Sequence, residues 1–308
     1  MKRNQASFAA AFGAVALTIG GGLLLARPAS AAETTVAALA KETHFHGIAV
    51  DAKDASRIYL ATHHGLFLVR PDGRAERISR TRDDFMGFTP HPSDPSVLFA
   101  SGHPAGGGNL GFITSTDGGV SWRKLSDGLG GPVDFHNMDV SAADPQVIYG
   151  TYRDLQKSTD GGRSWTRVGP PPDGLIALAA SSRNSDTLYA ATQRGLLRSA
   201  DGGKSWSAAH LLQRPATTVH VTRDGTVYAF LVGTGLIRAA EKDLGWQVVG
   251  NGFAGAYVLH LAVAPGDDRR VYAVTFDPET RGQGVLASGD GGKSWTTLGA
   301  APASGQRH

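Results

Sequence analysis

An eight-residue motif that recurs along the chain constrains the fold more than any other feature of the sequence. Four clear copies read STDGGVSW at 115–122, STDGGRSW at 158–165, SADGGKSW at 199–206 and SGDGGKSW at 288–295. The first three begin 43 and 41 residues apart, and the gap of 89 residues before the last leaves room for one more unit. A period in the forties indicates a repeat fold, in which each copy is one supersecondary unit.

Two degenerate copies complete the series. AAEKDLGW at 239–246 fills the long gap, and VRPDGRAER at 69–77 precedes the first clear copy, with Asp72 lying 45 residues before Asp117. Each of the five tryptophans of the chain closes one of these motifs. The chain therefore contains six units.

Each unit is predicted to form four short strands. In the first unit these are HGIAVDA (46–52), SRIYLAT (56–62), GLFLVRP (65–71) and AERIS (75–79), separated by Gly- and Asp-rich turns. Four strands per repeat at this period are typical of propeller blades. We therefore expect an all-β, six-bladed β-propeller as one domain over 32–308, with blades near 44–80, 84–128, 134–169, 174–212, 216–250 and 257–300. The stretch 33–42 is a candidate outer strand for the last blade.

The pattern Ser-x-Asp-Gly-Gly-x-x-Trp resembles the Asp-box, or BNR repeat, of sialidase-like, sortilin-like and related bacterial propellers. The resemblance covers almost the whole chain after residue 31. It implies that each motif forms the turn between the third and fourth strands of a blade, at its outer side. Glycines permit a positive φ there, and the Asp side chain can accept bonds from turn N–H groups. We expect these aspartates to be structural rather than catalytic: Asp117, Asp160, Asp201 and Asp290.

The first 31 residues have the pattern of a secretory signal peptide. Lys2 and Arg3 precede an apolar stretch from Phe8 to Leu25, and Ala29-Ser30-Ala31 is an Ala-x-Ala cleavage site. The alternative is an uncleaved membrane anchor. Either interpretation places the rest of the chain outside the cytoplasm: secreted, periplasmic or in the cell envelope. No second apolar span of membrane length follows.

Composition after this segment excludes some functions. The whole chain has 30 basic and 27 acidic residues, and three of the basic ones lie within 1–31, so the remainder is formally neutral. This balance gives no electrostatic basis for nucleic-acid binding. There are no cysteines, so an exported domain must be stable without disulfides.

Aligning the units with one another gathers polar residues at the start of the inner strands of blades 1 to 3. Phe45, Phe85 and Phe135 occupy the shared core-facing position. The opposite face carries two tiers, the first with His44, Asp84 and Asp134, the second with His46, Met86 and His136. Blades 4 to 6 lack this pattern.

A second alignment uses the turn after the second strand, where His64, His103, Arg153 and Arg194 fall in register. In propellers both places lie near the mouth of the central channel. We expect the following histidines to converge there: His44, His46, His63, His64, His103 and His136.

Several imidazoles held close together need a compensating partner, because they repel when protonated and lose solvation when buried. Neutral imidazole is the commonest metal ligand, and Asp84 and Asp134 can act as ligands or orient them. We therefore predict a transition-metal site, with copper or zinc as the metal. The thioether of Met86 would favour copper, whereas Met138 aligns with core positions. The predicted ligands are His44, His46, His64, His103, His136, Asp84, Asp134 and Met86.

Other interpretations stay open. The cluster can form a sugar or small-anion pocket, or a purely structural polar plug in the channel. Classical sialidase activity is not expected, because the early Phe/Tyr-Arg-Ile-Pro segment is absent and no third arginine joins Arg153 and Arg194. Asp84 and Asp134 can instead serve as the two carboxylates of another glycoside hydrolase. The chain can also be a non-catalytic scaffold for an exported protein partner.

Overall fold

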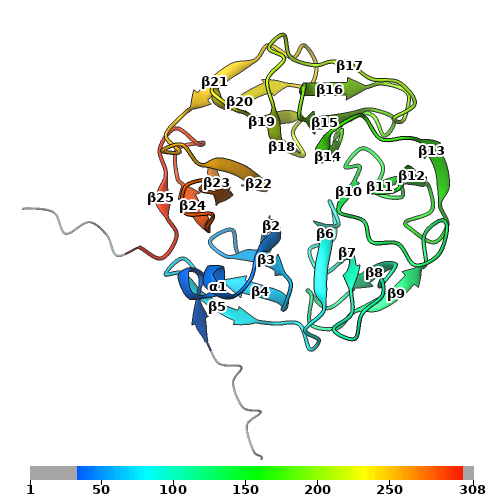
Figure 1. Ribbon diagram of the computed structural model, residues 1–308, viewed down its shortest axis with the longest axis horizontal. Helices are drawn as coiled ribbons and strands as arrows, with labels where there is room; N and C mark the ends of the chain where they lie inside the picture. The colour runs from blue at the N-terminus through cyan, green and yellow to red at the C-terminus, as the bar shows by residue number, and fades with distance from the viewer. Residues whose placement is uncertain (1–32, 301–308) are drawn as a thin grey trace, which may run out of the picture. The chain divides into compact units, whose positions relative to one another are not determined.

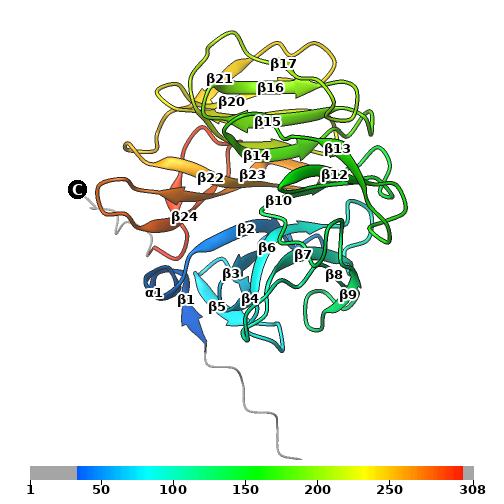
Figure 2. The ribbon, with the colours of Figure 1, turned by 45° about the vertical axis from the view of Figure 1, so that its right-hand side comes forward.

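Six antiparallel sheets surround a central axis in residues 33–300, the part of the chain that the computed structural model describes (Figure 1). Each sheet is built from four consecutive strands, and a short additional strand joins the first sheet. Figure 2, turned by 45°, shows the same sheets from another side. The predicted six-bladed propeller is confirmed. The proposed signal segment, 1–31, lies outside the described residues.

Four kinds of strand follow one another in every blade. The inner strands are β2 (Phe45–Val50), β6 (Asp84–Pro90), β10 (Asn137–Val140), β14 (Leu175–Ala180), β18 (Ala216–Val221) and β22 (Tyr257–Ala264). The second strands are β3 (Ile58–Thr62), β7 (Leu98–His103), β11 (Ile148–Tyr152), β15 (Leu188–Thr192), β19 (Thr226–Leu231) and β23 (Asp267–Phe276). The third strands are β4 (Gly65–Val69), β8 (Phe112–Ser115), β12 (Asp154–Ser158), β16 (Gly195–Ser199), β20 (Gly235–Ala240) and β24 (Gln283–Ser288). The outer strands are β5 (Arg74–Arg77), β9 (Arg123–Ser126), β13 (Thr166–Gly169), β17 (Ser207–Ala208), β21 (Gln247–Gly250) and β25 (Thr296–Thr297).

The repeated motif forms the turn between the third and outer strands, as blade 3 illustrates. Ser158 Oγ accepts the Gly162 N–H at 2.8 Å and donates to Asp160 at 2.8 Å. The Asp160 carboxylate accepts the backbone N–H groups of Arg163 and Ser164 at 3.0 and 2.9 Å. Gly162 has φ +87°, and a Cβ there would lie 2.0 Å from Phe112 of the preceding blade. The motif therefore closes its hairpin and also seats it against the neighbouring sheet.

Hydrophobic side chains fill the space between adjacent sheets. Trp165 contacts Phe112 of blade 2 at a ring-centroid distance of 5.3 Å and Phe135 at 4.8 Å. Phe135 is buried here, like its equivalents Phe45 and Phe85, as predicted. Met138 lies in the same cluster. These inter-blade cores fix where each inner strand begins.

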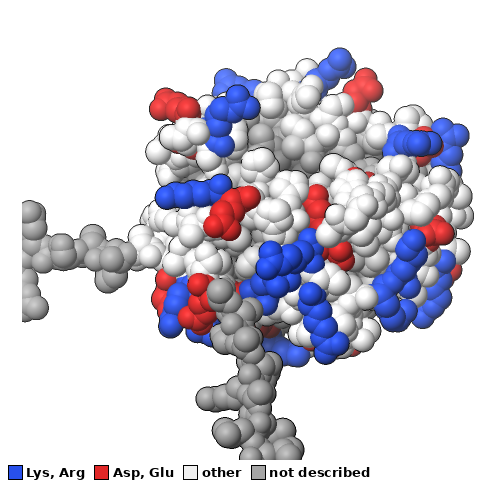
Figure 3. All heavy atoms as spheres, turned by 60° about the horizontal axis from the view of Figure 1, so that its bottom comes forward, with Lys and Arg blue, Asp and Glu red and all other residues white. Residues whose placement is uncertain are grey.

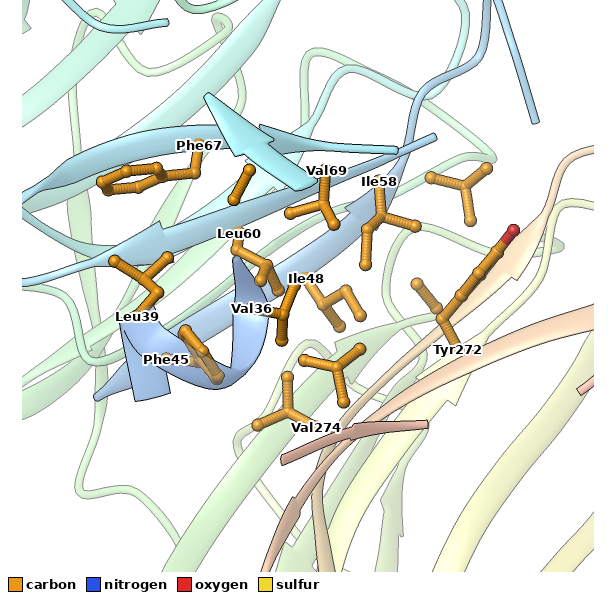
Figure 4. Packing of buried hydrophobic residues seen from close by; sticks show 14 of the residues in the cluster. Val36, Leu39, Phe45, Ile48, Ile58, Leu60, Phe67, Val69, Tyr272 and Val274 are labelled. Carbon is orange, nitrogen blue, oxygen red and sulfur yellow. The ribbon is translucent and has the colours of Figure 1, made fainter. Parts of the chain in front are cut away.

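Helix α1 (Val36–Glu42) lies where the first and last blades meet. Thr35 caps it by accepting the Ala38 N–H at 3.1 Å, and the helix buries Val36 and Leu39. Figure 4 shows both side chains in a cluster with Phe45 of blade 1 and Val274 of blade 6. The preceding strand β1 (Thr34–Thr35) pairs with β5 in blade 1. Segment 33–42 therefore adds its strand to the first blade, and the expected outer strand for the last blade is not formed from it.

The surface charge is mixed, and the described helix content includes no membrane span. On the face drawn in Figure 3, Lys and Arg side chains are interspersed with Asp and Glu side chains. Within residues 33–300, no helix has the length and apolar character needed to span a membrane.

Candidate functional site

The polar residues of blades 1 to 3 gather where inner strands begin and second strands end. In blade 2, Asp84 pairs across the sheet with His103, next to the buried pair Phe85 and Gly102. In blades 1 and 2 the buried phenylalanine lies within the inner strand, so its neighbours along the strand face the opposite side, whereas in blade 3 Asp134, Phe135 and His136 precede β10. The repeat thus places histidines and carboxylates of successive blades next to one another.

The first group contains His46, His63 and Asp84. His63 Nδ1 lies 2.8 Å from Asp84 Oδ2, and His46 Nε2 lies 3.1 Å from His63 Nε2 and 3.7 Å from Asp84 Oδ1. A carboxylate only accepts, so Nδ1 of His63 carries the proton when this imidazole is neutral. His46 Nε2 lies almost equally far from the two ring nitrogens of His63, 3.2 Å from Nδ1 and 3.1 Å from Nε2.

The second group contains His103, Asp134 and His136. Asp134 Oδ2 lies 2.6 Å from His136 Nε2 and 3.1 Å from His103 Nε2. His103 Nδ1 also lies 2.8 Å from the Gly108 carbonyl oxygen. The Gly108 carbonyl accepts from Nδ1, so Nε2 of a neutral His103 carries a lone pair beside the Asp134 carboxylate, an arrangement that a cation between them would stabilise.

Both groups meet a geometric requirement for a metal centre. In each, one ligand atom per residue lies within 4.8 Å of the others. Asp84 Oδ1 and Asp134 Oδ1 are buried without a hydrogen-bond partner. Buried carboxylate oxygens normally have partners, so these two mark where a cation or an additional donor would be stabilised.

The two groups share one electrostatic environment. Burial and then the His63 charge lower the pKa of His46 to about 4, against the opposing effect of Asp84. The hydrogen bond to Asp134 raises the pKa of His136, against the effect of burial, and the charges of Asp134 and Asp84 add to the increase. His46 is therefore a neutral imidazole at physiological pH, with a lone pair to offer.

Other predicted ligands lie beside these groups. The His44 ring is exposed, with its centroid 5.6 Å from that of His63. The His64 ring centroid lies 6.5 Å from that of His63, and Met86 is buried in β6. Within residues 33–300, the two three-residue groups include none of these three side chains.

His63, rather than His64, is the histidine that the structure brings to Asp84. Thr62 pairs with Phe45, and Gly102 pairs with Phe85, so strand register makes His63 the equivalent of His103. The sequence alignment was shifted by one residue because it matched the two turns by their histidines. Counting from the buried phenylalanines gives the correct register.

A cavity of about 680 Å³ adjoins the second group, between blades 3 and 4. Asp134 and His136 line one side, and Tyr152, Arg153 and the prolines 170–172 line the rest. The Arg153 guanidinium lies 5.5 Å from the centre of the Tyr152 ring, and the residue has φ +61°. Left-handed backbone at a bulky residue costs energy and is concentrated at functional sites.

Solved structures with a similar fold include two glycoside hydrolases. A GH74 enzyme from Niastella koreensis matches with a TM-score of 0.57 and 16% identity, over 83% of this chain and 45% of that one. A GH74 xyloglucanase from Xanthomonas campestris matches with a TM-score of 0.56 and 18% identity, over 86% and 46%. A Bacteroides thetaiotaomicron protein of unknown function matches with a TM-score of 0.55 and 12% identity, over 81% and 67%.

These similarities show the fold alone, because the sequence identities are low. The chain spans less than half the length of either GH74 enzyme. No protein-family model matches the sequence, and no curated protein matches it.

Proposed function

We propose that this chain is an exported propeller that binds copper or zinc at the mouth of its channel, through blades 1 to 3. The observation that carries the proposal is the pair of groups with two histidines and one aspartate each, with ligand atoms within 4.8 Å of one another. Imidazole nitrogen with carboxylate oxygen is a donor set that suits both metals. Export rests on the signal-like pattern of residues 1–31.

The protonation pattern supports a metal over a structural plug. A plug needs every buried polar atom satisfied, yet one oxygen of Asp84 and one of Asp134 lack a partner. The lowered pKa keeps His46 neutral, so no proton has to be displaced when this imidazole coordinates a metal. The Gly108 carbonyl fixes the His103 ring, so that Nε2 faces Asp134. Such a contact to the second nitrogen is the usual way in which a ligand histidine is oriented.

Calorimetric titration of untagged, metal-stripped protein with zinc and with copper tests the proposal. We expect saturable binding that falls at least tenfold in affinity in the double variant His46→Ala/His136→Ala, since each group loses one of three ligands. The matched control is His64→Ala, which removes a nearby imidazole outside both groups. Unchanged binding in the double variant, or an equal loss in the control, would contradict the assignment.

A second candidate function is glycoside hydrolysis with Asp84 and Asp134 as the carboxylates. The cavity beside Asp134 favours it, because an aromatic ring and proline walls next to a carboxylate suit a sugar ring. If this function is correct, the protein releases sugar from at least one member of a glycan panel that includes xyloglucan. The activity would be abolished by Asp134→Asn and would persist with a chelator, which separates this function from a metal-dependent one.

A further inference from the structure

Exposed apolar side chains gather at one place between blades 4 and 5. Five large apolar side chains are exposed among the described residues, and three of them are Leu211, Leu212 and Val248. Leu211 is 97% exposed, so its side chain contacts almost nothing in its own chain. Single exposed apolar residues are common on protein surfaces, whereas a group of them marks an interaction surface.

The two leucines belong to the segment that leads from β17 to β18, and we call residues 209–214 the leucine loop (Figure 1). The Trp246 indole N–H donates to the Ala209 carbonyl oxygen at 2.7 Å, and the His210 ring packs against this indole at a centroid distance of 5.7 Å. His210 Nδ1 accepts the Leu212 N–H at 3.0 Å. These contacts fix the backbone of the loop, so the exposed leucines stand on a firm base.

Val248 of β21 extends the same surface. It is paired across the sheet with Ile237, so the two side chains lie on one face of blade 5. Ile237 is buried in a cluster against which Ala209 and Trp246 pack. Val248 is 63% exposed. It therefore lies at the surface end of this cluster, beside the leucine loop.

Two exposed arginines border the leucine loop. Arg214 ends it, and its guanidinium donates to the Gly233 carbonyl oxygen at 3.4 Å. Arg194 lies in the turn after β15, where a Cβ on its neighbour Gly195 would lie 3.5 Å from the Leu212 carbonyl oxygen. The turns at this end of blades 4 and 5 contain no aspartate or glutamate: 193–194, 209–215, 232–234 and 250–256. The charge that these turns place around the apolar group is therefore positive.

This combination favours a lipid bilayer over a protein as the partner. Leucine and valine are under-represented among the residues that anchor protein interfaces. A stable protein interface also buries about 800 Å² on each partner, more than three side chains provide. A bilayer accepts individual aliphatic side chains at the boundary between headgroups and acyl chains, and anionic lipids attract nearby arginines.

We propose that the leucine loop and Val248 form a docking surface for an anionic lipid bilayer. The side chains of Leu211 and Leu212 enter the boundary of the acyl chains, while Val248 lies against the headgroups. The guanidiniums of Arg194 and Arg214 pair with headgroup phosphates. The surface contains no residue of the histidine groups, and the proposal does not rest on the proposed metal function.

Vesicle titration of a dye-labelled protein tests the proposal. The full chain contains no cysteine, so Leu211→Cys creates a single labelling site. An environment-sensitive dye there should shift its emission to shorter wavelength with mixed phosphatidylglycerol and phosphatidylcholine vesicles, because it enters an apolar layer. Vesicles of phosphatidylcholine alone should require at least about tenfold more lipid, since the arginines lose their anionic partners. Adding Arg194→Gln and Arg214→Gln to the labelled protein should have the same effect.

Leu129 provides the matched control, because it is exposed at the equivalent place between blades 2 and 3. It lies three residues after Ser126, as Leu212 lies three residues after Ala209, and both of these residues accept from the indole N–H of the next blade. Its loop, 127–133, contains Asp127 and no arginine or lysine. A dye attached through Leu129→Cys should therefore show no shift with either kind of vesicle.

Leu212→Ser, added to the protein labelled at position 211, should weaken the response to anionic vesicles roughly fivefold, because part of the inserted apolar area is lost. Circular dichroism establishes that each variant is folded. The proposal is overturned if the dye at position 211 responds to neither kind of vesicle, a result that would assign the surface to a protein partner. It is also overturned if positions 211 and 129 respond equally, or if the folded arginine double variant responds as strongly as the protein that keeps both arginines.

Discussion

Asp139 in β10 joins three inner strands through one half-buried carboxylate. It accepts the Ala180 N–H of β14 at 2.8 Å, its neighbour Val140 N–H at 2.9 Å and the Thr89 hydroxyl of β6 at 3.2 Å. Burial raises its pKa to about 6, although these three hydrogen bonds act in the opposite direction. Asp139 is therefore both a link between blades and a group that resists ionisation.

Stability should accordingly depend on the ionisation of Asp139. The folded-state pKa lies above the unfolded value of 3.8, so the folded state retains a proton that the unfolded state releases. The contribution is fully present below about pH 4 and is lost as the pH rises through about 6, with a total on the order of 3 kcal/mol. Urea unfolding from pH 4 to 7 should show this slope in the wild type and not in Asp139→Asn. Parallel curves for the two proteins would contradict the account.

Histidine positions show what the sequence could and could not predict at this scale. His46, His136, Asp84 and Asp134 were predicted from their places beside the shared phenylalanines, and His103 from the turn after the second strand. His63 was displaced by His64 because the turns were aligned by themselves, whereas His63 and His103 each lie 18 residues after the buried phenylalanine of their own blade. Asp139 was missed because its partners belong to three different blades, and no spacing along the chain reveals such contacts.

At the scale of the element, the repeated motif is a hydrogen-bonded turn in which the serine is central. Ser158 is 1% exposed, and its hydroxyl accepts the buried N–H of Gly162 and donates to Asp160. Ser158→Ala should lower the free energy of unfolding by about 1–3 kcal/mol, because the Gly162 N–H loses its acceptor. Urea denaturation measures this change. Thr159→Ala, at the exposed neighbouring position, is the control, and an equal effect of both substitutions would refute the assigned role.

The strands of each blade could be predicted because glycine and aspartate mark their turns and apolar residues alternate between them. The place of segment 33–42 could not, because it contains no copy of the motif. Its two-residue strand is specified by pairing with Arg74 and Ala75, and its helix by the apolar gap that Val36 and Leu39 fill.

At the scale of the whole propeller, closure relies on side-chain packing between the first and last blades. Blade 6 consists of four consecutive strands, β22 to β25, and takes no strand from blade 1. The two blades are joined by the α1 cluster and by contacts such as Phe45 N–H to Gln283 Oε1 at 2.6 Å and Tyr272 hydroxyl to Ala55 carbonyl at 3.1 Å. Because no strand is shared between blades 1 and 6, the closure of the propeller depends on how well this hydrophobic cluster is packed.

Leu39→Ala should therefore destabilise the propeller by about 2–5 kcal/mol, since Leu39 is buried in the closing cluster and leaves a cavity. Hydrogen exchange should rise first in blades 1 and 6. Ala37→Ser, on the exposed side of the same helix, should change unfolding by less than about 1 kcal/mol. An equal loss of hydrogen-exchange protection in all six blades, with the free energy of unfolding unchanged, would contradict a local role of Leu39 in closing the propeller.

The fold as a whole was predictable because six sequence repeats of this length leave few architectures open. The chemistry of the proposed metal site was less predictable, because it depends on three blades that differ from one another.

Elemental analysis of untagged wild-type protein, purified without chelator, tests the metal proposal most directly. We predict copper or zinc in stoichiometric amount, up to one ion for each of the two histidine groups, and its loss in His46→Ala/His136→Ala. Protein that carries no transition metal, and takes up none on reconstitution, would contradict it.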